Sequence, residues 1–200
     1  PLLINEYSAS NRNFNDGFGR NEDWIELFNS SPDTYFNLAG YHLSNNINNP
    51  TKWQIQNGVI PPNSRVLIFC SSRGISSGTV LHANFDLTQT DNDEVVLADP
   101  SGTIIESHEM FVTQTNHSYG RTSDGATTWS VFSTPTPGTQ NTAGSSNYAT
   151  KPYMSIAPGK YTGPVSVTLS TTGINEEIRY TTNGSTPTAT STLYTCPINI

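Results

Sequence analysis

The chain has 200 residues, of which 12% are charged, and its formal net charge at pH 7 is −7. A chain of this length can bury one or two modest hydrophobic cores. Its few lysines and arginines form no basic stripe, which excludes a protein that binds nucleic acid through the phosphate backbone. The acidic balance also disfavours an anionic membrane surface. No apolar run approaches the roughly 18 residues of a spanning helix, so we expect no membrane insertion.

Short strands dominate the chain, because no window carries the i, i+3, i+4, i+7 apolar stripe of a helix. In the stretch DWIELFN, Ile25 and Leu27 fall on one face of a strand, whereas Glu26 falls on the other with its aromatic neighbours. An all-β fold is therefore predicted. The expected strands of the first part are residues 2–7, 24–29, 40–44, 53–55, 66–70, 94–98, 103–107, 118–121 and 128–132.

Turn residues indicate two hairpins. Residues 99–102, Asp-Pro-Ser-Gly, place Pro at the second turn position and Gly shortly after it, which fits a hairpin with a bulge. Asp124 and Gly125 lie between two predicted strands and give a second hairpin signal.

Residues 134–141, TPTPGTQN, end the strand pattern, because each Pro removes a donor from a β-ladder. A stretch rich in Gly, Ser, Asn and Thr follows, with the composition of a flexible linker. We therefore expect a first domain at residues 1–142, a linker at 143–150 and a second domain at 151–200. The strands expected in the second domain are residues 153–156, 165–170, 177–182 and a last run from 196.

Motifs in a fixed order link the two ends of the first domain: DWIELFN at 23–29, LAGYHLS at 38–44, EVVLAD at 94–99, SYGR at 118–121 and TPTPG at 134–138. Together they resemble the lamin tail domain of bacterial type, an immunoglobulin-like β-sandwich. The resemblance implies a domain that is, as a rule, not an enzyme. The side chains expected in its core are Phe36, Leu38, Tyr41, Leu43, Trp53, Phe85, Val95 and Leu97.

The second domain contains IRYTTNGSTPT at residues 178–188, which is a strand, an Asn-Gly turn and a return that carries Pro. With YTGPVSV at 161–167, it resembles the C-terminal module of chitobiase and β-hexosaminidase. The resemblance implies a second, smaller β-sandwich. The pattern of that family continues for one more strand beyond Ile200, so we expect a module truncated at its C-terminal end. The start of the chain runs straight into a strand, as though a leader had been removed.

Carboxylates offer the first candidate chemistry. Glu26 lies among apolar neighbours, as a catalytic carboxylate does, but no partner carboxylate is close in sequence. A glutamate half-covered at a strand surface is therefore favoured. The runs Asp91-Asn92-Asp93-Glu94 and Asn13-Phe14-Asn15-Asp16 could supply oxygen ligands to calcium. Because neither has the spacing of an EF-hand, solvated turns are favoured, and whether a calcium ion binds stays open.

No other catalytic pattern is present in the sequence. The histidines share no i, i+4 spacing and no HExxH context, no GxSxG nucleophile elbow occurs, and residues 17–20 lack the Lys-Ser/Thr of a phosphate loop. The sequence therefore predicts no catalytic, cofactor-binding or metal-binding residue and no enzymatic activity. The histidines are His42, His82, His108 and His117.

Tyr161, Tyr180 and Tyr194 could form a stacking platform for sugars. Since a domain of this size needs its aromatic residues for its own core, burial is favoured, for Tyr180 above all. Cys70 and Cys196 are expected to be buried free thiols in different domains, with a disulfide as the alternative.

We therefore expect a non-catalytic accessory module of a larger secreted or cell-surface bacterial protein, acting as a spacer or in adhesion or protein binding. The alternative is a carbohydrate-binding module that serves an enzyme domain elsewhere in the polypeptide. Few lysines and many Thr, Asn and Gly residues are typical of extracellular proteins, so the expected partner is a protein or glycan at the cell surface.

Overall fold

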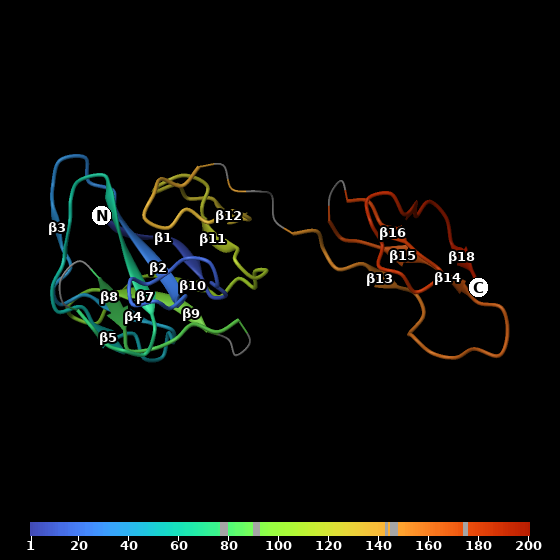
Figure 1. Cartoon of the computed structure of the whole chain (residues 1–200), viewed down its shortest axis with the longest axis horizontal. Coiled ribbons are helices and arrows are strands. Elements are labelled where there is room, and N and C mark those ends of the chain that lie inside the picture. Colours follow the sequence, from blue (N-terminus) through green and yellow to red (C-terminus); the bar gives the residue numbers. More distant parts are fainter. Residues whose placement is uncertain (77–79, 90–92, 143, 145–147, 174–175) are drawn as a thin grey trace. The chain divides into compact units, whose positions relative to one another are not determined.

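The computed structural model describes residues 1–76, 80–89, 93–142, 144, 148–173 and 176–200. The chain divides into two compact units, Pro1–Asn147 and Tyr148–Ile200. Both are built from β-strands, and the described residues contain no helix, which confirms the predicted all-β class (Figure 1).

Two larger sheets and one two-stranded ladder make up the described part of the first unit. In the described residues, one has the strand order β12-β11-β1-β2-β7-β8 and the other β10-β9-β4-β5, while β3 pairs with β6. All pairings are antiparallel except that of β7 with β8. The strands are β1 (Leu2–Ser8), β2 (Asp23–Asn29), β3 (Phe36–Asn37), β4 (His42–Ser44), β5 (Trp53–Gln54), β6 (Val59–Ile60), β7 (Ser64–Cys70), β8 (Leu81–Ala83), β9 (Glu94–Ala98), β10 (Ile104–Glu109), β11 (Ser118–Arg121) and β12 (Trp129–Phe132).

One hydrophobic core draws side chains from both sheets. Ile25 and Leu27 of β2 meet Leu43 of β4 and Val95 of β9 in this cluster, and each is fully buried. Of the core residues predicted from sequence, six are buried, and the other two are half-buried against the core. The buried ones are Leu38, Leu43, Trp53, Phe85, Val95 and Leu97, and the half-buried ones are Phe36 and Tyr41.

Strand β1 breaks the regular alternation of a strand. Ile4 pairs with Leu27 and Glu6 pairs with Glu26, so that Asn5 is the extra residue of a β-bulge. Ile4 belongs to the core, whereas the side chains of Asn5 and Glu6 bond to groups on the opposite face of the sheet. The bulge therefore keeps Glu6 out of the core, where strict alternation would have placed it.

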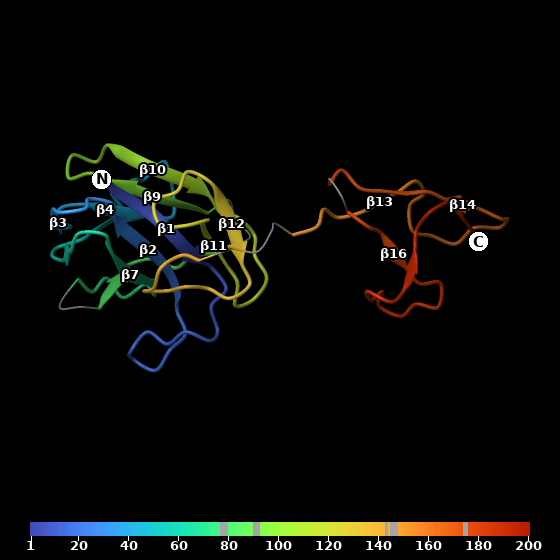
Figure 2. The same ribbon diagram turned by 90° about the horizontal axis from the view of Figure 1, so that it is seen from above.

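Hairpins occur where turn residues predicted them. Strands β9 and β10 pair across residues 99–102, with a register shift after Ile104, and Gly102 has a φ of +86°. Strands β11 and β12 pair across the turn that contains Gly125, whose φ is +71°. The loop of residues 9–22 between β1 and β2, drawn in blue, projects from the sandwich (Figure 2).

The second unit consists, in its described part, of three two-stranded ladders, β13-β15, β14-β18 and β16-β17. None of its described residues is buried, and Tyr180 is only half-buried, so the prediction of a buried Tyr180 is wrong. Ladders of two residues per strand present too little surface to enclose a ring of that size. The strands are β13 (Tyr153–Met154), β14 (Ser166–Val167), β15 (Leu169–Ser170), β16 (Arg179–Tyr180), β17 (Thr192–Leu193) and β18 (Ile198–Asn199).

Both cysteines are free. Cys70 is buried in the first unit, where burial raises the pKa of its thiol. Cys196 is exposed in the second unit, which corrects the expectation that it is buried.

Candidate functional site

A pair of glutamates lies on the outer face of the six-stranded sheet. Glu6 and Glu26 are register partners on β1 and β2, and neither has any exposed surface. The opposite neighbour of Glu6 is Gly120 of β11, where a Cβ atom would come within 2.8 Å of Glu6 Cγ. A glycine in a strand marks such a close approach, so Gly120 provides the space that Glu6 occupies.

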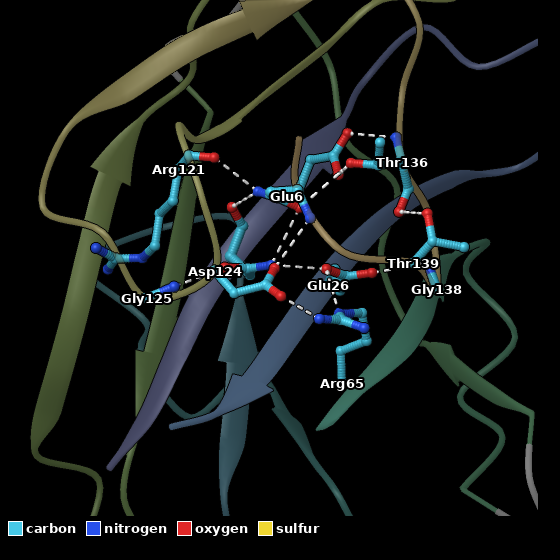
Figure 3. A network of polar contacts seen from close by, with 11 residues as sticks. Glu6, Glu26, Arg65, Arg121, Asp124, Gly125, Thr136, Gly138 and Thr139 are labelled. Carbon is cyan, nitrogen blue, oxygen red and sulfur yellow. Dashed lines mark hydrogen bonds and ion pairs between the residues drawn. The ribbon is translucent and has the colours of Figure 1, made fainter. Parts of the chain in front are cut away.

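Residues 134–141, which we call the strap, cross this face and supply hydrogen-bond donors (Figure 3). The backbone N–H of Thr136 donates to Glu6 Oε1 at 3.0 Å, and its hydroxyl donates to Glu6 Oε2 at 2.6 Å. The N–H of Gly138 donates to Glu26 Oε2 at 2.7 Å. A turn orients these two backbone N–H groups: Thr139 N–H donates to Thr136 O at 3.0 Å, and Gly138 has a φ of +74°.

The bulged Asn5 joins Glu26 to a third carboxylate, that of Asp124. Its side-chain amide donates to Glu26 Oε1 at 2.9 Å and to Asp124 Oδ1 at 3.0 Å. Asp124 also pairs with the Arg65 guanidinium, whose Nε lies 3.8 Å from Glu26 Oε1. Asn141, at the end of the strap, donates its backbone N–H to Asp124 Oδ1 at 3.1 Å. Two carboxylates, Glu26 and Asp124, thus pair with one guanidinium beneath the strap (Figure 3).

Burial governs the electrostatics of the pair. It raises the pKa of Glu26 to about 8, although hydrogen bonds from Asn5 and Gly138 act in the opposite direction, and the neighbouring charge of Glu6 adds to the rise. Burial also raises the pKa of Glu6 against the hydrogen bonds from Ser118 and Thr136. Ionising both glutamates therefore costs free energy in the folded state.

This cost predicts how stability depends on pH. The folded chain holds the Glu26 proton up to a pKa of about 8, whereas the ordinary value is 4.5. The contribution of the Glu26 proton to stability is therefore complete below pH 4.5 and is lost as pH rises through 8, with a slope of about 1.4 kcal/mol per pH unit between these values. Urea unfolding at several pH values should show this slope in the wild type and a smaller one in Glu26→Gln. Equal slopes in the two proteins would contradict the prediction.

The pair cannot act on a substrate in this arrangement. Each carboxylate oxygen of Glu6 and Glu26 accepts a hydrogen bond from the chain itself, and the strap covers both groups. A general acid or base must reach the substrate directly or through one water. The favoured interpretation of Glu26 as half-covered is wrong, because the strap, more than 100 residues away in sequence, closes over the face of the sheet that Glu26 shares with Trp24 and Phe28.

The acidic run before β9 lies on the other sheet. Asp93 accepts the N–H of Thr88 at 2.7 Å and the side-chain amide of Asn45 at 3.3 Å. Asp91 and Asn92 lie outside the described residues. In the described part of the chain, neither Asp93 nor Glu94 bonds to Glu26 or to a histidine, so the sequence candidates do not meet in one site.

The loop at residues 13–16 is not simply solvated. Asp16 is buried, accepts the N–H groups of Phe18 and Arg20, and pairs with Arg73 Nη1 at 2.7 Å. Burial alone would raise the pKa of Asp16, but these hydrogen bonds and the guanidinium outweigh it and lower that pKa. The Arg73 side chain also reaches Glu22 at 3.3 Å, so it holds two points of the loop of residues 9–22 against the segment that follows β7.

One contact between a possible nucleophile and a possible base was not predicted from the sequence. The hydroxyl of Ser71 lies 2.8 Å from His82 Nδ1, and the two residues are 11 positions apart. His82 is fully buried between the rings of Phe18 and Phe69, and its Nε2 has no partner in the described part of the chain. A triad needs a third group that orients the base, and none bonds to this imidazole there.

The remaining histidines make hydrogen bonds within the sandwich. His42 Nδ1 lies 3.0 Å from the carbonyl of Asp99, and His108 Nε2 lies 2.6 Å from Glu106. The carbonyl of His117 accepts the hydroxyl of Ser8 at 2.9 Å. Across the described residues, no group of three His, Cys, Asp or Glu side chains could hold a metal ion. The same residues contain no helix long and apolar enough to cross a membrane.

The three tyrosines of the second unit do not form one flat platform. Tyr161 is 46% exposed, and its hydroxyl donates to the carbonyl of Ala157. Tyr180 and Tyr194 are half-buried, with ring centroids 6.5 Å apart and planes at 76°. Rings in edge-to-face contact pack against each other rather than offering one shared stacking face.

Two β-sheets packed around one hydrophobic core are the architecture of an immunoglobulin-like sandwich. The family model of the Lamin Tail Domain matches residues 1–111, which is more than half of the chain, so the chain belongs to this family. The model of the Chitobiase/beta-hexosaminidase C-terminal domain matches residues 156–200. Both resemblances inferred from the motifs are thereby confirmed. No curated protein and no solved structure matches this chain.

The match to the Lamin Tail Domain ends before β11 and the strap. Strand β11 pairs with β1, and the strap bonds to Glu6 and Glu26, yet both lie beyond residue 111. Residues 112–141 are therefore an integral part of the same sandwich.

Proposed function

We propose that this chain is a non-catalytic interaction module of a larger secreted or cell-surface protein, with a sandwich domain at residues 1–142, a linker at 143–150 and a second module at 151–200. The observation that carries the proposal is the closed state of its buried carboxylates, which bond to the chain's own strap. Both matched families are accessory domains, which supports the same conclusion.

Activity assays test this proposal. The purified chain should show no turnover of glycosides, nucleic acid or phosphoesters, with or without a divalent metal. Turnover that survives repurification and disappears in Glu26→Gln would overturn the proposal. The variant Glu109→Gln, which changes an exposed strand glutamate, controls for unspecific effects.

One depression favours the second candidate, carbohydrate binding. It measures about 230 Å³ and is lined only by uncharged residues, including Phe14, Pro135 and Pro137 together with Asn13 and Asn116. Apolar surfaces beside side-chain amides suit a neutral sugar, which offers both C–H faces and hydroxyl groups. Phe14 is 38% exposed and stacks on Phe69.

A glycan array followed by titration distinguishes the two candidates. If the depression binds a neutral oligosaccharide, Phe14→Ala should weaken binding by about tenfold, the effect of losing roughly one stacking contact. The control Tyr35→Ala removes a ring that is 67% exposed outside this depression and should leave binding unchanged. An array without any binding would leave the protein-interaction proposal and remove the carbohydrate one.

A further inference from the structure

The chain contains two Asn-Gly pairs, Asn57-Gly58 and Asn183-Gly184, in different surroundings. Such a pair can react with itself, because glycine has no side chain to keep its backbone nitrogen away from the amide carbon of the preceding asparagine. Whether the reaction occurs depends on whether the fold brings these two atoms together.

At Asn183 the fold favours the approach. The side-chain oxygen Oδ1 accepts the backbone N–H of Ser185 at 3.0 Å and the Ser185 hydroxyl at 2.7 Å. The bond to the backbone two residues on closes an Asx turn, and the ring of atoms in this turn includes the Gly184 nitrogen. Two donors on one carbonyl oxygen also polarise it and stabilise the negative charge that an attack would place there.

The surroundings leave room for the Gly184 nitrogen to approach the side-chain amide carbon of Asn183. Asn183 and Gly184 are both exposed, and Gly184 has a φ of +80°. A Cβ placed on Gly184 would meet no atom within 4 Å. In the described residues, no backbone hydrogen bond from the Gly184 N–H is present, so its nitrogen is not held elsewhere.

The other pair is held differently. The carbonyl of Gly58 accepts the N–H of Leu38 at 2.9 Å, directly before β6, and a Cβ on Gly58 would lie 3.2 Å from Leu38 Cδ1. No hydrogen bond to the Asn57 side chain is present in the described structure, so nothing draws its amide carbon toward Gly58. The fold therefore restrains this pair.

We propose that Asn183 is a site of spontaneous deamidation and that the fold selects it over Asn57. The Gly184 nitrogen gives its proton to water and attacks Cγ of Asn183, forming a C–N bond. The bond from Cγ to Nδ2 then breaks, and ammonia leaves after taking up a proton. One water molecule opens the resulting cyclic imide at either carbonyl, which yields aspartate or isoaspartate.

The product alters a surface of the second unit. Asn183 lines a depression of about 300 Å³ together with Tyr180 and Thr190, and no charged residue lines it before the reaction. Either product adds a carboxylate there. Isoaspartate also lengthens the backbone by one atom at the turn, which breaks the geometry of the bonds to Ser185. The depression thus becomes acidic with time.

Peptide mapping by mass spectrometry tests this proposal on the full chain during incubation at mildly alkaline pH. Conversion at Asn183 should be about tenfold faster than at Asn57, as a barrier lower by about 1.4 kcal/mol would give. Ser185→Ala removes one donor and should slow conversion at Asn183 alone. In strong denaturant the two sites should convert at similar rates, because the unfolded chain no longer favours Asn183 over Asn57.

Three results would overturn the proposal: equal rates at Asn57 and Asn183 in the folded chain, an unchanged rate in Ser185→Ala, or the same preference for Asn183 in denaturant. Since Ser185 lies in an exposed turn, this variant should fold. A matched Thr190→Ala change on the same loop controls for unspecific loosening.

Discussion

Replacing Glu26 by alanine should lower the free energy of unfolding of the first unit by about 2–5 kcal/mol, because each buried hydrogen-bond donor left without an acceptor costs about 1–3 kcal/mol and this change leaves two. The side-chain amide of Asn5 and the N–H of Gly138 would lose their acceptor. Arg65, whose Nε has no hydrogen bond in the described structure, would lose its ion pair with Glu26 and keep the one with Asp124. Denaturant unfolding followed by tryptophan fluorescence measures the change.

Glu109→Ala is the matched control for this variant. Glu109 is also a strand glutamate, but its side chain is exposed, so its removal should change stability by no more than about 0.5 kcal/mol. If Glu26→Ala and Glu109→Ala unfold at the same denaturant concentration as the wild type, the buried network does not stabilise the sandwich.

Trp53→Ala should destabilise the first unit by about 3–5 kcal/mol, because removing a large buried ring leaves a cavity. Trp53 is 5% exposed, pairs with Leu43 across β5 and β4, and belongs to the core cluster. Its control is Tyr35→Ala, since Tyr35 is 67% exposed. A melting temperature of Trp53→Ala equal to that of the control would show that β5 is wrongly placed against the core.

Strand positions could be predicted where apolar alternation and turn chemistry agree. Strands β9 and β11 match the predicted residues 94–98 and 118–121, and β2 begins one residue earlier than predicted. The predicted strand at 165–170 is instead two short strands, β14 and β15, which pair with different partners. The strands β3, β6, β8 and β17 were missed, because ladders of two or three residues depend on tertiary contacts rather than on a local pattern.

The candidate site could be predicted only in part. Alternation placed Glu26 on the face opposite the core, which is correct, since Ile25 and Leu27 belong to the core cluster. Its burial depends on the strap, which no local pattern around Glu26 reveals. One signal was available: regular alternation from Ile4 would have put Glu6 inside the core, and avoiding this required a bulge at Asn5.

In the second unit, side-chain environments departed from prediction for one physical reason. A small domain buries its aromatic residues only where two closed layers enclose them. The described residues form three short ladders, which leave Tyr180 half-buried and Cys196 exposed. Apolar periodicity predicts which residues point inward, but not how much surface covers them.

Hydrogen exchange of the Thr136 and Gly138 amides is the most direct test of the central claim, that Glu6 and Glu26 form an internal clamp rather than a reactive centre. Both amides lie in an irregular segment, where exchange is ordinarily fast, and both donate to buried carboxylates. The clamp predicts slow exchange in the wild type and faster exchange of the Gly138 amide in Glu26→Ala. Wild-type amides that exchange as fast as those of an exposed loop would contradict it.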